Sequence, residues 1–177
     1  MTEPVEYLAE QLQANDLSAP DTAMILGSGL GGMTDEMDIA LSVSYDEVPG
    51  LAASTVEGHA GRFVVGTVGD VDVLGMDGRV HYYETGDMDP IVAPIRTLGE
   101  MGCQRLLITN AAGGINADYE PGDVMLIEDH INMQGTNPLI GKAGLGDGPM
   151  FPDMTTAYSP DLLAEARDLA DDSPLTI

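Results

Sequence analysis

Basic residues are scarce in this chain, in which 30 acidic residues stand against 6 basic ones and the formal net charge is −24. Lys142 is the single lysine, and the other basic residues are arginines. Such a surface repels nucleic acid and anionic membranes, so neither is expected as a partner. It also repels free phosphate, so a phosphate site requires a local cluster of positive charge. The acids are spread along the chain, which favours a protein adapted to a salty cytoplasm, where the Debye length falls to about 3 Å at 1 M salt. An acidic protein in an ordinary cytoplasm is the alternative.

Other absences narrow the class of protein further. The sequence has no run of about 18 apolar residues, so we expect no transmembrane helix. Its acidic N-terminus has no apolar segment typical of a secretory signal, which predicts a cytoplasmic location. The single Cys103 cannot form an internal disulfide and is expected to be a small buried hydrophobe. With 177 residues and 44% apolar content, the chain fits one domain over residues 1–177.

The hydrophobic spacing predicts mixed strands and helices. Apolar residues recur at helical spacing in three segments and form short runs or alternate in six others. The expected helices are 4–15, a segment from Pro90 to Gly102, and 160–171 with Ser159 as N-cap; the expected strands are 22–26, 41–47, 62–68, 71–76, 105–110 and 124–127. Without a strict alternation of strand and helix, this order indicates an α/β domain with a mixed sheet flanked by helices.

Two small-residue loops each follow an apolar strand. The segment Gly27–Gly32 follows the strand 22–26, and the segment Asn110–Gly114 follows the apolar run that ends at Thr109. Glycine allows backbone N–H groups to approach a ligand closely because it has no Cβ. The segment Gly78–Glu84 lies between the two loops and supplies arginine, histidine and tyrosine donors. Together the three segments predict a site that uses phosphate.

The first loop also matches G-x-G-x-x-G, the pattern of dinucleotide-binding folds, with Glu47 as the acid for the ribose. The following residues 33–38 are too few for a crossover helix, because parallel strands need a connection of a dozen or more residues. A dinucleotide site is therefore the least favoured interpretation. A purely structural turn and an anion-binding loop with the Ser28 hydroxyl as donor both remain open.

Arg79 and His81 are two residues apart just after a strand, so an extended backbone would aim both side chains the same way, with Tyr83 on that face. Arginine can hold a phosphate with two parallel hydrogen bonds, and histidine can donate another. A solvated strand end is the alternative. His59 lies in a glycine-containing turn that is either structural or a mobile part of the site. No second ligand is suitably spaced from Asp129 and His130, so we expect no metal.

These segments resemble the trimeric purine nucleoside phosphorylases, in the family's order and over nearly the whole chain. The related methylthioadenosine phosphorylases share the fold, but residues 110–114 are more similar to the purine nucleoside branch. The matching segments are Gly27–Gly31, Gly58–Arg62, Gly78–Glu84, Thr109–Gly114, Gly122–Ile127, Asp129–Asn132 and Phe151–Met154.

The resemblance implies a pentosyltransferase, a glycosyltransferase of purine salvage that converts a purine ribonucleoside or deoxyribonucleoside and phosphate to free base and the sugar 1-phosphate. Inorganic phosphate is the co-substrate, no cofactor or metal is implied, and the complete protein is expected to be a homotrimer. The implied site residues are His81 and Glu84 for catalysis; Ser28, His59, Arg79, His81 and Ala111 for phosphate; and Tyr83 and Phe151 for ribose, with Phe151 closing over a neighbouring subunit's sugar.

The sequence departs from the family at its end. Family members continue beyond this point, and that part supplies the groups that bind the purine, a further phosphate-binding serine and a histidine near the ribose 5′-hydroxyl. Residues 175–177 resemble the opening of a strand. We therefore expect a phosphorylase-like domain whose C-terminal part is missing. The alternative is a non-catalytic remnant that binds phosphate or pairs with other subunits.

Overall fold

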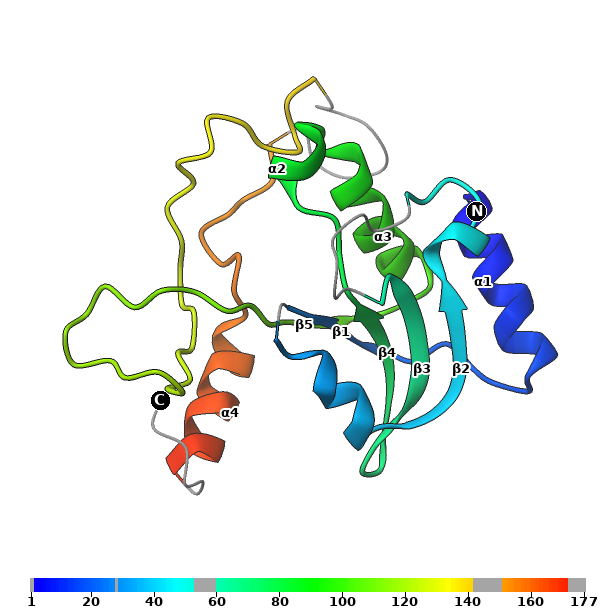
Figure 1. The fold of residues 1–177 in the computed structure, drawn as a ribbon, viewed down its shortest axis with the longest axis horizontal. Helices are drawn as coiled ribbons and strands as arrows, with labels where there is room; N and C mark the ends of the chain where they lie inside the picture. Colours follow the sequence, from blue (N-terminus) through cyan, green and yellow to red (C-terminus); the bar gives the residue numbers. More distant parts are fainter. Residues whose placement is uncertain (1, 28, 53–59, 142–150, 172–177) are drawn as a thin grey trace. The chain divides into compact units, whose positions relative to one another are not determined.

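The computed structural model describes residues 2–27, 29–52, 60–141 and 151–171. The chain divides into two compact units, Met1–Ala112 and Gly113–Ile177, and each is described by itself (Figure 1). The single domain expected over residues 1–177 therefore stays a prediction.

The first unit is built on a mixed sheet of five strands. Its strands are β1 (Thr22–Leu26), β2 (Asp38–Ser44), β3 (Arg62–Val68), β4 (Val71–Asp77) and β5 (Arg105–Ile108), in the spatial order β2-β3-β4-β1-β5 (Figure 1). Strand β1 pairs in parallel with both β4 and β5, whereas β3 is antiparallel to β2 and β4. The predicted α/β class with a mixed sheet flanked by helices is confirmed.

Strand β1 lies in the interior of the sheet, between β4 and β5, and is apolar on both sides. Four of its five residues are buried, including Ala23, Ile25 and Leu26, which is typical of a parallel strand covered on both faces. In a parallel arrangement the carboxyl ends of neighbouring strands meet at one edge of the sheet. The loops that follow β1, β4 and β5 consequently leave the sheet side by side.

The hairpin β3–β4 turns at Gly69 and Asp70 as predicted, and Gly69 has the positive φ of 60° that such a tight turn favours. Two other strands differ from their predicted bounds. Strand β2 begins at Asp38, and residues 45–47 form a 3-10 turn, η2 (Tyr45–Glu47), rather than the end of a strand. There the Glu47 carboxylate accepts a hydrogen bond from the Ser44 N–H, which stabilises a turn. Strand β5 ends at Ile108 rather than residue 110.

The topology rejects the dinucleotide-binding interpretation. The segment after β1 forms the 3-10 turn η1 (Gly31–Glu36) and leads to β2, which is antiparallel to β3 and not a neighbour of β1. A dinucleotide-binding unit requires a crossover helix between two parallel strands at this point, and the described residues between β1 and β2 contain no such helix.

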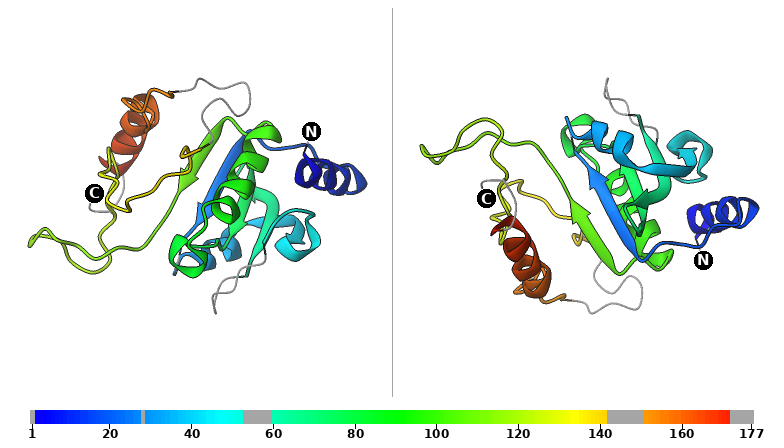
Figure 2. Two further views of the ribbon diagram at one scale, coloured as in Figure 1. Left: turned by 90° about the horizontal axis from the view of Figure 1, so that it is seen from above. Right: turned by 90° about the horizontal axis from the view of Figure 1, so that it is seen from below.

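Helices α1 (Glu3–Ala14) and α3 (Asp89–Glu100) contribute to the main core. Leu8 and Leu12 from α1 and Leu98 from α3 join buried residues of the sheet, among them Phe63. A smaller cluster contains Met37, Val64 and Val73. Helix α1 lies at the β2 end of the sheet, and β5 forms the opposite edge (Figures 1 and 2). Exposed Leu107 and Ile108 fit this edge position of β5.

The predicted helices are found within a few residues of their expected bounds. Helix α3 ends just before Gly102, whose φ of 102° continues the chain in a left-handed conformation. Cys103 follows, partly buried, and its S–H donates to the Pro20 carbonyl oxygen over 3.3 Å. Burial and the nearby Asp21 raise the pKa of this thiol, which fits a structural rather than a reactive cysteine.

In the second unit, α4 (Pro160–Asp171) confirms the last predicted helix. The Ser159 hydroxyl accepts a long hydrogen bond of 3.4 Å from the Leu162 N–H, consistent with the predicted N-cap. The strand predicted at 124–127 is wrong, because these residues form no regular element. A strand needs a hydrogen-bonded neighbour, and the second unit contains no strand within its described residues. None of the helices in the described part of the chain is long and apolar enough to cross a membrane.

Candidate active site

Three loops meet at the carboxyl edge of β1, β4 and β5. Leu26 at the end of β1 is in register with Asp77 at the end of β4, and Ile25 is in register with Ile108 at the end of β5. The segments that begin at Gly27, Gly78 and Thr109 therefore start at neighbouring points. These are the three segments that the sequence assigned to a phosphate site, and the sheet brings their starting points together.

Thr109 joins the first and third loops by hydrogen bonds. Its hydroxyl donates to the Ile25 carbonyl oxygen over 3.0 Å and accepts the Gly27 N–H, also over 3.0 Å. A Cβ added to Gly27 would lie 2.4 Å from the Thr109 carbonyl oxygen and 2.7 Å from the Asn110 Cα. Both are backbone atoms, so Gly27 is required here for close approach between loops rather than for a positive φ.

Arg79 supplies positive charge at this edge. Its side chain is half-buried, and its Nη1 donates to the Thr109 carbonyl oxygen over 3.4 Å, a long hydrogen bond. Burial lowers the pKa of Arg79, but a guanidinium remains protonated at neutral pH. Arg62, Arg105 and Arg167 form ion pairs with carboxylates. None of the ion pairs among the described residues involves Arg79.

His81, Tyr83 and Glu84 are brought together by a short helical turn, α2 (Tyr82–Thr85). The imidazole of His81 stacks on the ring of Tyr83 with 5.2 Å between the ring centroids and 14° between the planes. The Glu84 carboxylate accepts a hydrogen bond from the His81 backbone N–H. The sequence predicted Arg79, His81 and Tyr83 on one face of an extended strand, whereas the stacking of His81 on Tyr83 arises across the start of a helical turn. The predicted extended backbone holds only to His81, because the turn begins at Tyr82.

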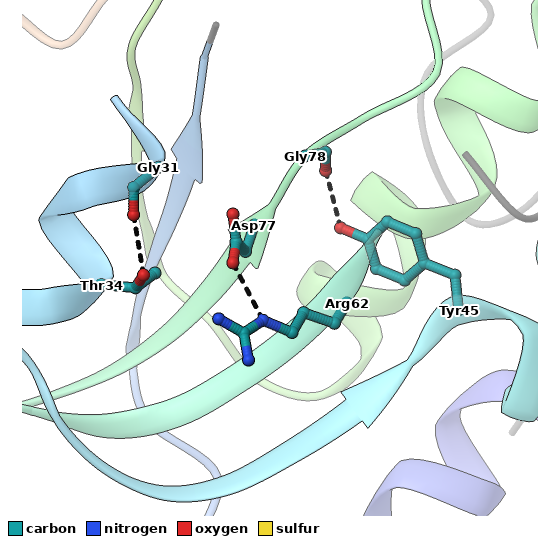
Figure 3. Close-up of polar contacts among 6 residues, drawn as sticks. All are labelled: Gly31, Thr34, Tyr45, Arg62, Asp77 and Gly78. Atoms are coloured by element: carbon teal, nitrogen blue, oxygen red, sulfur yellow. Dashed lines mark hydrogen bonds and ion pairs between the residues drawn. The ribbon is translucent and has the colours of Figure 1, made fainter. Parts of the chain in front are cut away.

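Partly buried polar contacts underlie the second loop (Figure 3). The Asp77 carboxylate pairs with Arg62 over 2.9 Å, and the Tyr45 hydroxyl donates to the Gly78 carbonyl oxygen over 2.8 Å. Burial and the neighbouring Asp77 raise the pKa of Tyr45, which keeps its hydroxyl protonated and able to donate. Gly78 directly precedes Arg79 and has a φ of 93°. These contacts fix the point from which the Arg79 backbone starts.

The predicted site residues are distributed unevenly over the structure. Arg79, His81, Tyr83, Glu84 and Ala111 belong to the first unit and lie on the loops that follow β4 and β5. Phe151 belongs to the second unit and is exposed. The remaining two predicted residues, Ser28 and His59, lie outside the described residues.

Sequence reasoning missed three contributors to this edge. Thr109 entered as the end of an apolar run and the first residue of a matching segment, without a role for its side chain, and neither Tyr45 nor Asp77 was considered for the site. A polar residue at the end of an apolar run was an available signal for Thr109 and Asp77. Tyr45 carried none, because its partner Gly78 is 33 positions away.

The chemistry of this edge suits an anion. It combines a half-buried arginine, a histidine and the backbone of small-residue loops that begin at three neighbouring strand ends. The described residues include no cluster of three or more His, Cys, Asp or Glu side chains that could hold a metal ion.

Known proteins match the chain over most of its length. Purine nucleoside phosphorylase 1 of Bacillus subtilis (strain 168) is 42% identical over 177 residues, which is 100% of this chain and 65% of that enzyme. The purine nucleoside phosphorylase of Rattus norvegicus is 40% identical over 167 residues, covering 93% of this chain and 58% of the relative. The chain therefore spans about 60% of the length of the curated relatives it matches.

The solved structures that resemble this chain include purine nucleoside phosphorylases. Isoform 2 of purine nucleoside phosphorylase from Schistosoma mansoni, in complex with cytosine and ribose-1-phosphate, superposes with a TM-score of 0.80 at 35% identity, covering 96% of this chain and 59% of that one. Purine nucleoside phosphorylase from the same organism in complex with inosine gives 0.77 at 30% identity, over 98% of this chain and 62% of that one. The sequence model of the phosphorylase superfamily matches residues 23–177, and the chain belongs to this family.

Proposed function

We propose that this chain carries the phosphate half of a purine nucleoside phosphorylase site. In the proposed reaction, phosphate cleaves the N-glycosidic bond of a purine ribonucleoside or deoxyribonucleoside and yields the free base and the sugar 1-phosphate. The observation that carries the proposal is the convergence of three loops on one sheet edge, with Arg79 half-buried there and involved in none of the ion pairs among the described residues. The similarity to enzymes of this name supports the choice of reaction.

In this proposal, phosphate is held by donors from all three loops. Arg79 supplies the charge, His81 donates from the second loop, and the Ala111 N–H donates from the third. The Ser28 hydroxyl and His59 complete the set. Glu84 is proposed to act with His81, since its carboxylate accepts the His81 N–H and thereby holds the backbone from which the imidazole extends.

The chemistry then follows from placement and charge. Phosphate is a weak nucleophile, so holding it against the anomeric carbon supplies much of the rate. The bond to the base breaks ahead of attack, and positive charge develops on the sugar as in glycoside cleavage. A fixed phosphate anion beside that charge stabilises the transition state. Tyr83 is proposed to face the ribose, and Phe151 to cover the sugar bound by a neighbouring subunit.

Three finer proposals accompany the reaction. No cofactor is needed beyond phosphate as co-substrate. The complete protein is proposed to form a homotrimer in the cytoplasm. The net charge of −24 supports adaptation to a salty cytoplasm, because salt screens the self-repulsion of dense negative charge.

A second candidate is a non-catalytic remnant that binds phosphate or pairs with other subunits. The observation in its favour is that the chain spans 58–65% of the relatives' length, so activity of these 177 residues alone does not follow from the match.

The two candidates differ in one assay. The purified chain is incubated with inosine in molar KCl, with and without phosphate, and the release of hypoxanthine is followed. Release that depends on phosphate and is lost in Arg79→Ala supports the phosphorylase. Phosphate binding without release supports the remnant. Absence of both binding and release contradicts the proposed site.

A further inference from the structure

We propose that Thr109 is a positioning residue for the phosphate site, whose hydroxyl aligns the first loop with the third. The inference rests on the proposed function, because the loops matter only if they bind phosphate. The Thr109 side chain is not among the groups that the proposed function assigns to phosphate. Its place in the fold, one residue beyond β5 and beside the end of β1, carries the inference.

The Thr109 hydroxyl uses both of its hydrogen-bonding capacities. Its proton is donated to the Ile25 carbonyl oxygen, and a lone pair of the same oxygen accepts the Gly27 N–H, each over 3.0 Å. The Thr109 backbone N–H also donates to the Ile25 carbonyl oxygen, over 3.0 Å. If the hydroxyl were lost, the Ile25 carbonyl oxygen would therefore still accept the hydrogen bond from the Thr109 backbone N–H. The Gly27 N–H would lose the partner that the structure gives it.

The Gly27 N–H is the point at which the first loop leaves the sheet. Gly27 packs so closely on residues 109 and 110 that a Cβ would overlap their backbone atoms. The hydroxyl bond fixes this close contact and hence the position of Gly27, with which the first loop begins. Through its carbonyl oxygen, Thr109 also receives the Arg79 Nη1. One residue thus contacts all three loops of the candidate site.

Two substitutions separate the hydroxyl from the shape of the side chain. Thr109→Val keeps the branched shape and removes the hydroxyl, whereas Thr109→Ser keeps the hydroxyl and removes a methyl group. A residue that merely packs at the end of β5 would tolerate valine better than serine. A positioning hydroxyl predicts the reverse order.

A matched control is available on α3. Thr97 is buried, with 2% exposure, and its hydroxyl donates to the Ala93 carbonyl oxygen within the helix. Thr97→Val makes the same chemical change away from the three loops. It is expected to change the melting temperature without changing phosphate affinity.

The experiment titrates phosphate into the parent chain and the three variants by calorimetry in molar KCl, with melting temperatures measured in parallel. Hydrogen exchange of the Gly27 amide is followed by NMR without phosphate. We expect Thr109→Val to bind phosphate about five- to thirtyfold more weakly, as for the loss of one hydrogen bond in a site of this kind, and to lose protection at Gly27. Thr109→Ser should retain both properties.

Each outcome decides a different point. If Thr109→Val binds phosphate as the parent does, or if serine is worse than valine, the inference is overturned. If the parent itself binds no phosphate, the proposed function fails at this edge. In that case, loss of Gly27 protection in Thr109→Val alone would still support the link between the two loops, and unchanged protection would overturn it.

Discussion

Replacing Arg79 by alanine should weaken phosphate binding more than any other change of one charge in the described chain. Arg79 is half-buried, and none of the ion pairs among the described residues involves it. A hydrogen bond to a charged group contributes about 1.5–3 kcal/mol. Since each 1.4 kcal/mol is a factor of ten, the phosphate dissociation constant should rise about tenfold to a hundredfold.

The chain offers a matched control for this change. Arg96 lies on α3 and is exposed, and Arg96→Ala alters the net charge by the same amount. A purely long-range effect of charge would weaken phosphate binding equally in both variants, whereas a local site responds to Arg79 alone. Arg79→Lys separates charge from geometry, because an ammonium group cannot make the two parallel hydrogen bonds of a guanidinium.

The assay is calorimetric titration with phosphate, and then with sulfate, in molar KCl, where long-range repulsion by the acidic surface is screened. We expect the order parent, Arg79→Lys, Arg79→Ala from tightest to weakest, with Arg96→Ala equal to the parent. Equal affinity of Arg79→Ala and the parent would remove Arg79 from the site and would refute the reasoning.

Three further predictions concern the fold and its solvent. Gly27→Ala should lower the free energy of unfolding by about 1–3 kcal/mol, because its Cβ would overlap backbone atoms, whereas Gly32→Ala, with nothing within 4 Å, should change it little; equal effects in urea unfolding would count against the close loop packing. Tyr45→Phe should lower the free energy of unfolding by about 1–3 kcal/mol, since the buried Gly78 carbonyl loses its hydroxyl donor. Because the pKa of folded Tyr45 is raised, its contribution is complete below the unfolded pKa of about 10 and is lost as pH rises towards the folded value. Above about pH 10 the free energy of unfolding should therefore fall less steeply with pH in Tyr45→Phe than in the parent. Identical pH profiles of the two proteins would show that Tyr45 does not cause the loss of stability at alkaline pH. Finally, the melting temperature should rise from dilute buffer to molar KCl, because the net charge of −24 is then screened, and a flat or falling curve would argue against adaptation to salt.

The regular elements of the first unit were largely predictable because their signals are local. The apolar run at 22–26 and the hairpin turn at Gly69 and Asp70 depend on neighbouring residues, and both were predicted correctly. The strand at 124–127 was predicted wrongly because strand formation there depends on a pairing partner that is distant in sequence. Residues 124–127 have the composition of a strand, but no strand pairs with them among the described residues.

The candidate site was predictable in its residue types but not in its supports. Arg79, His81, Tyr83 and Glu84 are close in sequence, so a single segment could indicate them. The bond between Thr109 and Gly27 joins residues 82 positions apart, and the pair Arg62–Asp77 depends on the hairpin register. Hydrogen bonds of this kind follow from how strands pair, which no local pattern specifies.

The sequence by itself determined the class of the fold, the acidic surface and the segments proposed to bind phosphate, because composition, periodicity and short motifs are properties of neighbouring residues. Only the tertiary structure decided that β1 lies between β4 and β5, so that loops beginning at residues 27, 78 and 109 leave one edge together. The physical reason is that parallel pairing requires strands distant in sequence to share hydrogen bonds along their whole length. The candidate site lies at the edge of the sheet where the parallel pairing of β1 with β4 and β5 ends.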